Sequence, residues 1–230
     1  MKANVNKDRN HAYVLKIENI KAIWSLLQER IGKTTIIVKC KDDIEREFDD
    51  LKTFQIFENS KNKAIKHLII RSICIDSSKF ANIEFSDSLW RTVNIHIEAS
   101  ENVVRRLNDD INDIIDGIKP WYSKVAKIDF IPVLLGILAI LLMSYGKTLP
   151  ETSKSILTFQ EAFFSFSIVI IFFLLIIFII YLINILKKRY FPVAYFAIGQ
   201  GLNRFDLDEK VRWGVIVAFI VSVSASIVLL

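Results

Sequence analysis

Two sets of apolar residues in the first half of the chain recur three and four positions apart, as they do along one face of a helix. The first set is Ile17, Ile20, Trp24, Leu27 and Ile31, and the second is Val104, Leu107, Ile111, Ile114 and Ile118. Gly32 can end the first helix, and Ser100 offers an N-cap to the second. The second stripe is narrow, so it either packs on a sheet of its own domain, which we favour, or associates with a second copy.

Strand-like segments lie between these two helices. KTTIIVKC and AIKHLIIRSICID are short and β-branched, which predicts buried strands, and FDDLKTFQIFEN between them can form a short helix. In RTVNIHIEA, Val93, Ile95 and Ile97 alternate with polar residues, which predicts a strand with one core face and one polar face. Residues 1–127 are therefore predicted to form an α+β domain.

Apolar residues dominate after this domain, in three nearly uncharged runs at about 129–146, 162–186 and 212–230. The middle run has 25 residues without a charge, and at about 1.5 Å per residue it exceeds the roughly 30 Å of a bilayer core. The predicted fold class is an α+β cytosolic domain, 1–127, followed by an all-α membrane domain, 128–230, with three transmembrane helices.

The distribution of positive charge predicts the orientation. Six basic residues lie between the second and third runs, namely Lys187, Lys188, Arg189, Arg204, Lys210 and Arg212, whereas Lys147 and Lys154 alone lie between the first two. The more basic side faces the cytosol. The first residues also lack the apolar stretch of a signal peptide. We therefore expect a cytosolic N-terminus and an external C-terminus.

The segment RYFPVAYFAIGQGLNRFDLDEKVRW between the last two runs is too apolar for a free loop and too interrupted to span. We expect it to lie along the cytosolic membrane face, either as a structural hairpin or as a gating element. The residues predicted to lie at the membrane interface are Trp121, Tyr122, Arg204, Arg212 and Trp213.

Catalytic motifs are missing from the sequence. It contains no phosphate-binding glycine loop, no nucleophile elbow and no histidine pair at metal-ligand spacing. The acidic stretch DDIEREFDD lacks the ligand spacing of a calcium loop, and Cys40 and Cys74 are expected to be reduced core thiols. We therefore expect no catalytic residue, no metal site, no cofactor and no enzymatic activity.

Basic residues are the candidates for ligand binding because several of them cluster, whereas the net charge of +5 is too mild to indicate an anionic partner. The candidates are Lys61, Lys63, Lys66, Arg71, Arg105 and Arg106, with Trp90 available to stack on a base. Solvated surface is the competing interpretation for each cluster. Arg71 is the most informative of them, because it interrupts the apolar run LIIRSICI and a charge there needs a partner or a ligand.

Small residues recur at every fourth position of the last run: Gly214, Ala218, Ser222 and Ser226. They share one helix face, which either packs tightly against another helix or lines a narrow pathway between subunits. The three runs contain no ionisable residue in their interiors, which argues against a proton-coupled transporter and leaves a passive pore open.

The order of parts, together with FAIGQG followed by Arg204, resembles small bacterial membrane effectors of anti-phage defence, most closely the Hailong-type channel subunits. That resemblance implies the bacterial inner membrane, a homo-oligomer with a tetramer favoured, and a nucleotide or single-stranded DNA oligomer made by a partner nucleotidyltransferase. We expect an oligomeric, ligand-gated ion channel that depolarises the membrane. The alternatives are a membrane-anchored scaffold that recruits a protein partner and, less favoured, a membrane enzyme with an unfamiliar site.

Overall fold

The computed structural model of the chain describes residues 1–74, 79–88, 90–129, 131–132, 135–136, 140 and 159–228. The chain divides into two compact units, of which the first joins Met1–Lys127 with Tyr190–Leu230 and the second comprises Ile128–Arg189. The boundary after Lys127 coincides with the predicted one. Residues 190–230, however, group with the N-terminal domain instead of with the rest of the predicted membrane domain.

A six-stranded antiparallel sheet forms the centre of the first unit. Its strands are β1 (Lys2–Arg9), β3 (Lys33–Cys40), β4 (Glu45–Phe48), β5 (Ile65–Cys74), β6 (Lys79–Ser86) and β7 (Val93–Ser100). The spatial order is β1-β7-β6-β5-β3-β4. Strands β5, β6 and β7 are neighbours both in sequence and in space, and β1 closes one edge by pairing with β7 along its whole length.

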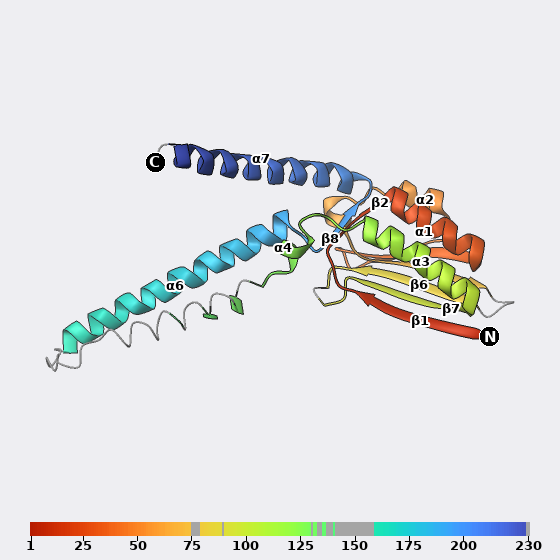
Figure 1. Ribbon diagram of the computed structural model, residues 1–230, viewed down its shortest axis with the longest axis horizontal. Helices are drawn as coiled ribbons and strands as arrows, with labels where there is room; N and C mark the ends of the chain where they lie inside the picture. Colours follow the sequence, from red (N-terminus) through yellow and green to blue (C-terminus); the bar gives the residue numbers. More distant parts are fainter. Residues whose placement is uncertain are drawn as a thin grey trace. The chain divides into compact units, whose positions relative to one another are not determined.

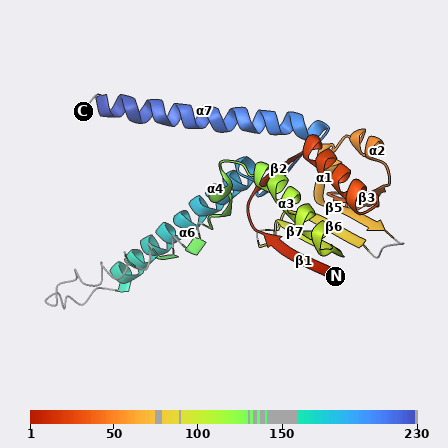
Figure 2. The same ribbon diagram turned by 45° about the vertical axis from the view of Figure 1, so that its right-hand side comes forward.

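Helices α1 (Ile17–Arg30) and α3 (Glu101–Gly117) lie side by side on one face of this sheet (Figures 1 and 2). The shorter α2 (Leu51–Gln55), η1 (Lys61–Lys63) and α4 (Ser123–Lys127) complete the N-terminal part. Leu27 and Leu107 from the two long helices are fully buried in one core with the strand residues Ile83 and Ile95. Each such side chain contributes about 1.5–3 kcal/mol of burial. We call the face of the sheet opposite α1 and α3 the open face.

Several predicted elements are confirmed. The helix expected at 17–31 is α1, and the narrow-striped helix is α3, which packs on β1 and β7 and on α1. Of the apolar stripe predicted for α3, Ile114 is only partly buried, whereas its neighbour Ile115 is fully buried. The strand segments correspond to β3, β5 and β7, and α2 begins after Asp50, whose side chain accepts from the backbone N–H of Thr53.

The location of residues 190–212 corrects the prediction of a segment lying along the membrane face. Strand β8 (Ala194–Ala197) pairs in parallel with β2 (Tyr13–Lys16), and Phe196 and Ile198 belong to the main core. Tyr13 makes edge-to-face ring contacts with both Phe85 and Phe196. The C-terminal segment is therefore an integral part of the α+β fold.

Within the described residues, one helix rather than the three expected is long and apolar enough to cross a membrane: Gln200–Ile227, in α7 (Gln200–Val228). The predicted run 162–186 lies inside a continuous helix, α6 (Phe159–Tyr190), and the run 129–146 lies largely outside the described residues. The helix predicted at 212–230 already begins at Gln200.

Candidate functional site

Helix α7 changes its surroundings along its length. Phe205, Asp208 and Arg212, three and four positions apart, are buried against the domain. From Trp213 onward the apolar side chains are mostly exposed, with Val215 64% and Phe219 69% accessible. One uninterrupted helix therefore joins the folded domain to an apolar segment that nothing covers in the described part of this unit.

Arg212 is held in an aromatic cage at this transition. Its guanidinium carbon lies 4.9 Å from the ring centroid of Tyr122 and 5.4 Å from that of Phe205, and its Nη1 donates to the carbonyl oxygen of Tyr190 at 2.8 Å. Nearby, the Tyr195 hydroxyl donates to Asp208 at 3.1 Å. Arg212 is only 2% exposed, so this charge is stabilised by protein groups.

Tyr122 is also buried, at 1% exposure. Burial raises the pKa of Tyr122 to about 12, and the neighbouring positive charge of Arg212 only partly opposes that increase. The expectation that Tyr122 and Arg212 meet lipid headgroups is therefore wrong, because the returning C-terminal segment covers both side chains.

A second contact holds the start of α7, through the buried side chain of Asn59. Its Nδ2 donates to the carbonyl oxygens of Phe196 and Ile198 at 2.9 and 3.2 Å, and its Oδ1 accepts from the backbone N–H of Ile65 at 2.9 Å. The Asn59 carbonyl in turn accepts from Nη2 of Arg204 at 2.7 Å. Arg204 is only partly buried, so this bond leaves its predicted contact with headgroups a prediction.

The two glycines of FAIGQG fit this close contact. Gly199 has a positive φ of +50°, and a Cβ there would lie 2.5 Å from the carbonyl oxygen of Glu58. A Cβ on Gly201 would collide with the carbonyl oxygen of Phe196 and with the amide of Asn59. Only glycine allows the turn between β8 and α7 to approach the loop before β5.

Two exposed tryptophans lie at the same transition. Trp121 and Trp213 are 55% and 51% exposed, and their ring centroids are 5.9 Å apart. Trp121 also contacts the ring of Phe191 at 6.2 Å. Exposed indoles beside the first apolar turns of α7 suit the boundary between water and lipid.

The small-residue face of α7 is uncovered. Gly214, Ala218, Ser222 and Ser226 are exposed, and a Cβ added to Gly214 would meet no atom of the described residues within 4 Å. The Ser222 hydroxyl donates to the carbonyl of Ala218 at 2.8 Å, and the Ser226 hydroxyl donates to that of Ser222 at 2.9 Å. Both hydroxyls are therefore satisfied within the helix, as an apolar environment requires.

The predicted ligand-binding residues do not converge. Lys61 and Lys63 lie exposed on η1, Lys66 pairs with Asp43 at 3.4 Å, and Trp90 is 87% exposed between β6 and β7. Arg105 and Arg106 are exposed on α3, which covers the opposite side of the sheet from the open face. Of these candidates, Arg71 is the one that lies on the open face. Strand β5 buries only one of its two faces, and Arg71 is on the other.

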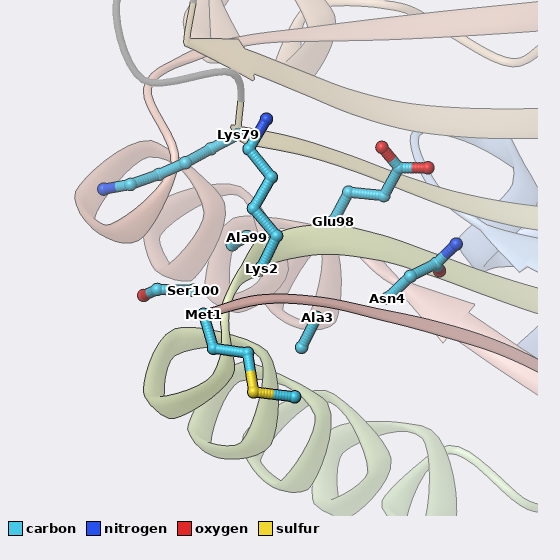
Figure 3. A pocket seen from close by; sticks show the side chains of 8 residues that line it. All are labelled: Met1, Lys2, Ala3, Asn4, Lys79, Glu98, Ala99 and Ser100. Carbon is cyan, nitrogen blue, oxygen red and sulfur yellow. The ribbon is translucent and has the colours of Figure 1, made fainter.

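An open hollow of about 510 Å³ lies at the start of β1 and the end of β7, beside the start of β6. Its lining residues are Met1, Lys2, Ala3, Asn4, Lys79, Glu98, Ala99 and Ser100. Figure 3 shows the side chains of Lys2, Asn4 and Glu98 on the same side of the strands, whereas those of Met1 and Ala3 lie on the other side. Within the described residues no cluster of three His, Cys, Asp or Glu side chains could hold a metal ion.

Sequence reasoning missed the residues that surround Arg71. They lie on β6, which we did not predict although KFANIEFS alternates: Ala81, Ile83 and Phe85 are buried, and Phe80 and Asn82 occupy the open face. This period of two is the signal that could have found them.

Comparison of the chain with protein-family models, curated proteins and solved structures finds no match.

Proposed function

We propose that this protein is an oligomeric membrane effector, with a tetramer favoured, that conducts ions and is gated by a ligand bound to its cytosolic α+β domain. Opening would depolarise the bacterial inner membrane as a defence against phage. The proposed ligand is a nucleotide or a single-stranded DNA oligomer, and the proposed membrane domain contains three spans with the N-terminus in the cytosol.

The observation that carries the proposal is the continuity of α7. Its first turns are bonded to the domain through Arg204 and Arg212, and the same helix continues without a break into exposed apolar turns. A flexible tether would allow the domain and the membrane segment to move independently. A rigid helix transmits a displacement of the domain directly to the face that bears Ser222 and Ser226.

Potassium flux from liposomes that contain the full-length protein tests the proposal, with and without short single-stranded DNA. We expect flux that depends on the ligand and that the double change Ser222→Leu and Ser226→Leu largely abolishes, because leucines would dehydrate a narrow polar pathway. Val217→Leu is the matched control and should leave the flux unchanged, because position 217 lies about 140° around the helix from Ser222 and about 180° from Ser226. Absence of flux under every ligand condition would contradict the channel.

The alternative, a membrane-anchored scaffold, is favoured by one feature of the sheet. β1 is an edge strand of eight residues, and such an edge can add a strand from a protein partner. A scaffold predicts no flux, a monomer or dimer in detergent and indifference to leucine at positions 222 and 226. Proline at Asn4 would weaken partner capture if the edge is used.

A further inference from the structure

Arg71 belongs to a polar row that crosses the open face. The strand registers place five residues side by side on β1, β7, β6, β5 and β3: Asn6, His96, Asn82, Arg71 and Thr35. Neighbouring strands are about 4.8 Å apart, so this row is about 19 Å long. We call it the Arg71 row. A row of this length can accommodate a ligand larger than a single small anion.

The Arg71 row leaves bonding capacity unused. Arg71 Nε and Asn82 Oδ1 are shielded from solvent, yet neither has a hydrogen-bond partner within the described residues. Two carboxylates on this face, those of Glu84 and Glu98, contact other side chains. Glu84 accepts from His67 at 2.8 Å and lies 3.8 Å from Arg91, and Glu98 lies 3.0 Å from His96. Among the described residues, therefore, no carboxylate forms an ion pair with Arg71 and no donor bonds to the Asn82 side-chain carbonyl.

An aromatic surface and one lysine lie on the same face as this pair. Phe80, two positions before Asn82 on β6, shares the open face, and its ring centroid lies 5.6 Å from that of His96. Glu98, the register partner of Phe80 on β7, lines the hollow of Figure 3, and Lys2 lies on the same side of the strands as Glu98. This part of the open face thus combines a guanidinium whose Nε has no partner among the described residues, a ring surface and one ammonium group.

We propose that the Arg71 row binds the phosphate of a nucleotide, with Arg71 on the phosphate, Asn82 accepting from a donor on the base or sugar, and Phe80 stacking on the base. A simple anion would satisfy Arg71 alone, whereas a nucleotide satisfies all three groups. The phosphate of a free nucleotide and that of a strand have the same chemistry. The inference rests on the proposed function, because it assigns a place to the regulatory ligand.

Fluorescence anisotropy tests the site with the full-length protein in detergent and fluorescein-labelled (dT)6. We expect Arg71→Gln to weaken binding about tenfold or more, because a charge-assisted hydrogen bond is lost. Phe80→Leu should weaken it about fivefold or more through lost stacking. Arg105→Gln removes the same charge from exposed α3 and should change the affinity less than about twofold. Arg71→Lys keeps the charge and should bind between wild type and Arg71→Gln.

Competition distinguishes the two sources of phosphate. Displacement by dTMP at concentrations similar to unlabelled (dT)6 assigns a free nucleotide, whereas displacement by (dT)6 alone assigns a strand. Displacement by inorganic phosphate as effectively as by dTMP would contradict the roles of Asn82 and Phe80. Absence of (dT)6 and dTMP binding, or equal loss in Arg71→Gln and Arg105→Gln, would overturn the site. If the site is overturned in this way, ligand-dependent flux would still support the channel. Conversely, binding that depends on Arg71 but produces no flux would refute the channel and leave the site standing.

Discussion

A buried arginine and a buried tyrosine meet where the C-terminal segment joins the domain. Arg212 has its charge stabilised by the rings of Tyr122 and Phe205 and by one carbonyl oxygen. The Tyr122 hydroxyl has no hydrogen-bond partner among the described residues. It therefore contributes little to stability in its neutral form and opposes folding when it ionises.

Replacing Tyr122 with phenylalanine tests this assignment. At pH 7 we expect Tyr122→Phe to be neutral or about 1 kcal/mol more stable, since an unpaired buried hydroxyl is removed. The pKa of Tyr122 is raised to about 12 in the folded state. The raised pKa therefore has no effect on stability below about pH 10, and relative to Tyr122→Phe the wild type loses roughly 2–3 kcal/mol of unfolding free energy as the pH rises from about 10 to above 12.

Urea unfolding in detergent at pH 7, 9 and 11 measures the difference between wild type and Tyr122→Phe. The raised pKa of Tyr13, also caused mainly by burial, is common to both proteins and cancels in the comparison. An equal loss of unfolding free energy in the two proteins above pH 10 would contradict the assignment.

At the scale of elements, the turn between β8 and α7 is fastened to the loop before β5. Asn59 satisfies two carbonyls of the C-terminal segment and one N–H of β5, and Gln200 donates its backbone N–H to Glu58 at 2.7 Å. The orientation of α7 is thus determined by a few directional bonds as well as by apolar packing.

Changing Asn59 to aspartate keeps the shape and removes the donor. In Asn59→Asp a carboxylate oxygen would face the carbonyls of Phe196 and Ile198, so we expect a loss of about 2–4 kcal/mol. Asn203→Asp, exposed on α7, is the matched control and should stay within about 0.5 kcal/mol of wild type. Amide hydrogen exchange at residues 200–212 locates the effect. Equal protection of these amides in both variants would argue against the role of Asn59 in attaching the start of α7.

At the scale of the whole molecule, the first unit is assembled from both ends of the chain. The parallel β2–β8 pair joins residues near the N-terminus to the segment after α6, and it places Phe196 and Ile198 in the main core. The N-terminal 127 residues are consequently an incomplete domain.

Residues 1–127 expressed alone should unfold at lower urea concentration than in the presence of a peptide of residues 190–212. The peptide restores β8 and the burial of Phe196 and Ile198, worth about 3–6 kcal/mol together. Circular dichroism with increasing urea measures the shift, and a peptide with Phe196→Asp and Ile198→Asp should produce none. Identical midpoints with and without the wild-type peptide would show that the segment is dispensable.

Local patterns in the sequence were sufficient wherever neighbouring residues decide the structure. The three- and four-residue spacing located α1 and α3, the β-branched runs located β3 and β5, and the uncharged run at the C-terminus predicted a helix able to cross a membrane. These features depend on helix periodicity, strand alternation and helix length, which act over a few turns or a single strand.

Only the tertiary structure decided where residues 190–212 belong and which face of β5 carries Arg71. A short apolar segment beside basic residues matches both a membrane surface and a buried strand, and the choice depends on β2, which is remote in sequence. Likewise, the apolar run LIIRSICI concealed that one face of β5 is open, because cross-strand register and the side covered by α1 and α3 determine burial. Non-local pairing therefore determined both the attachment of α7 and the surroundings of Arg71.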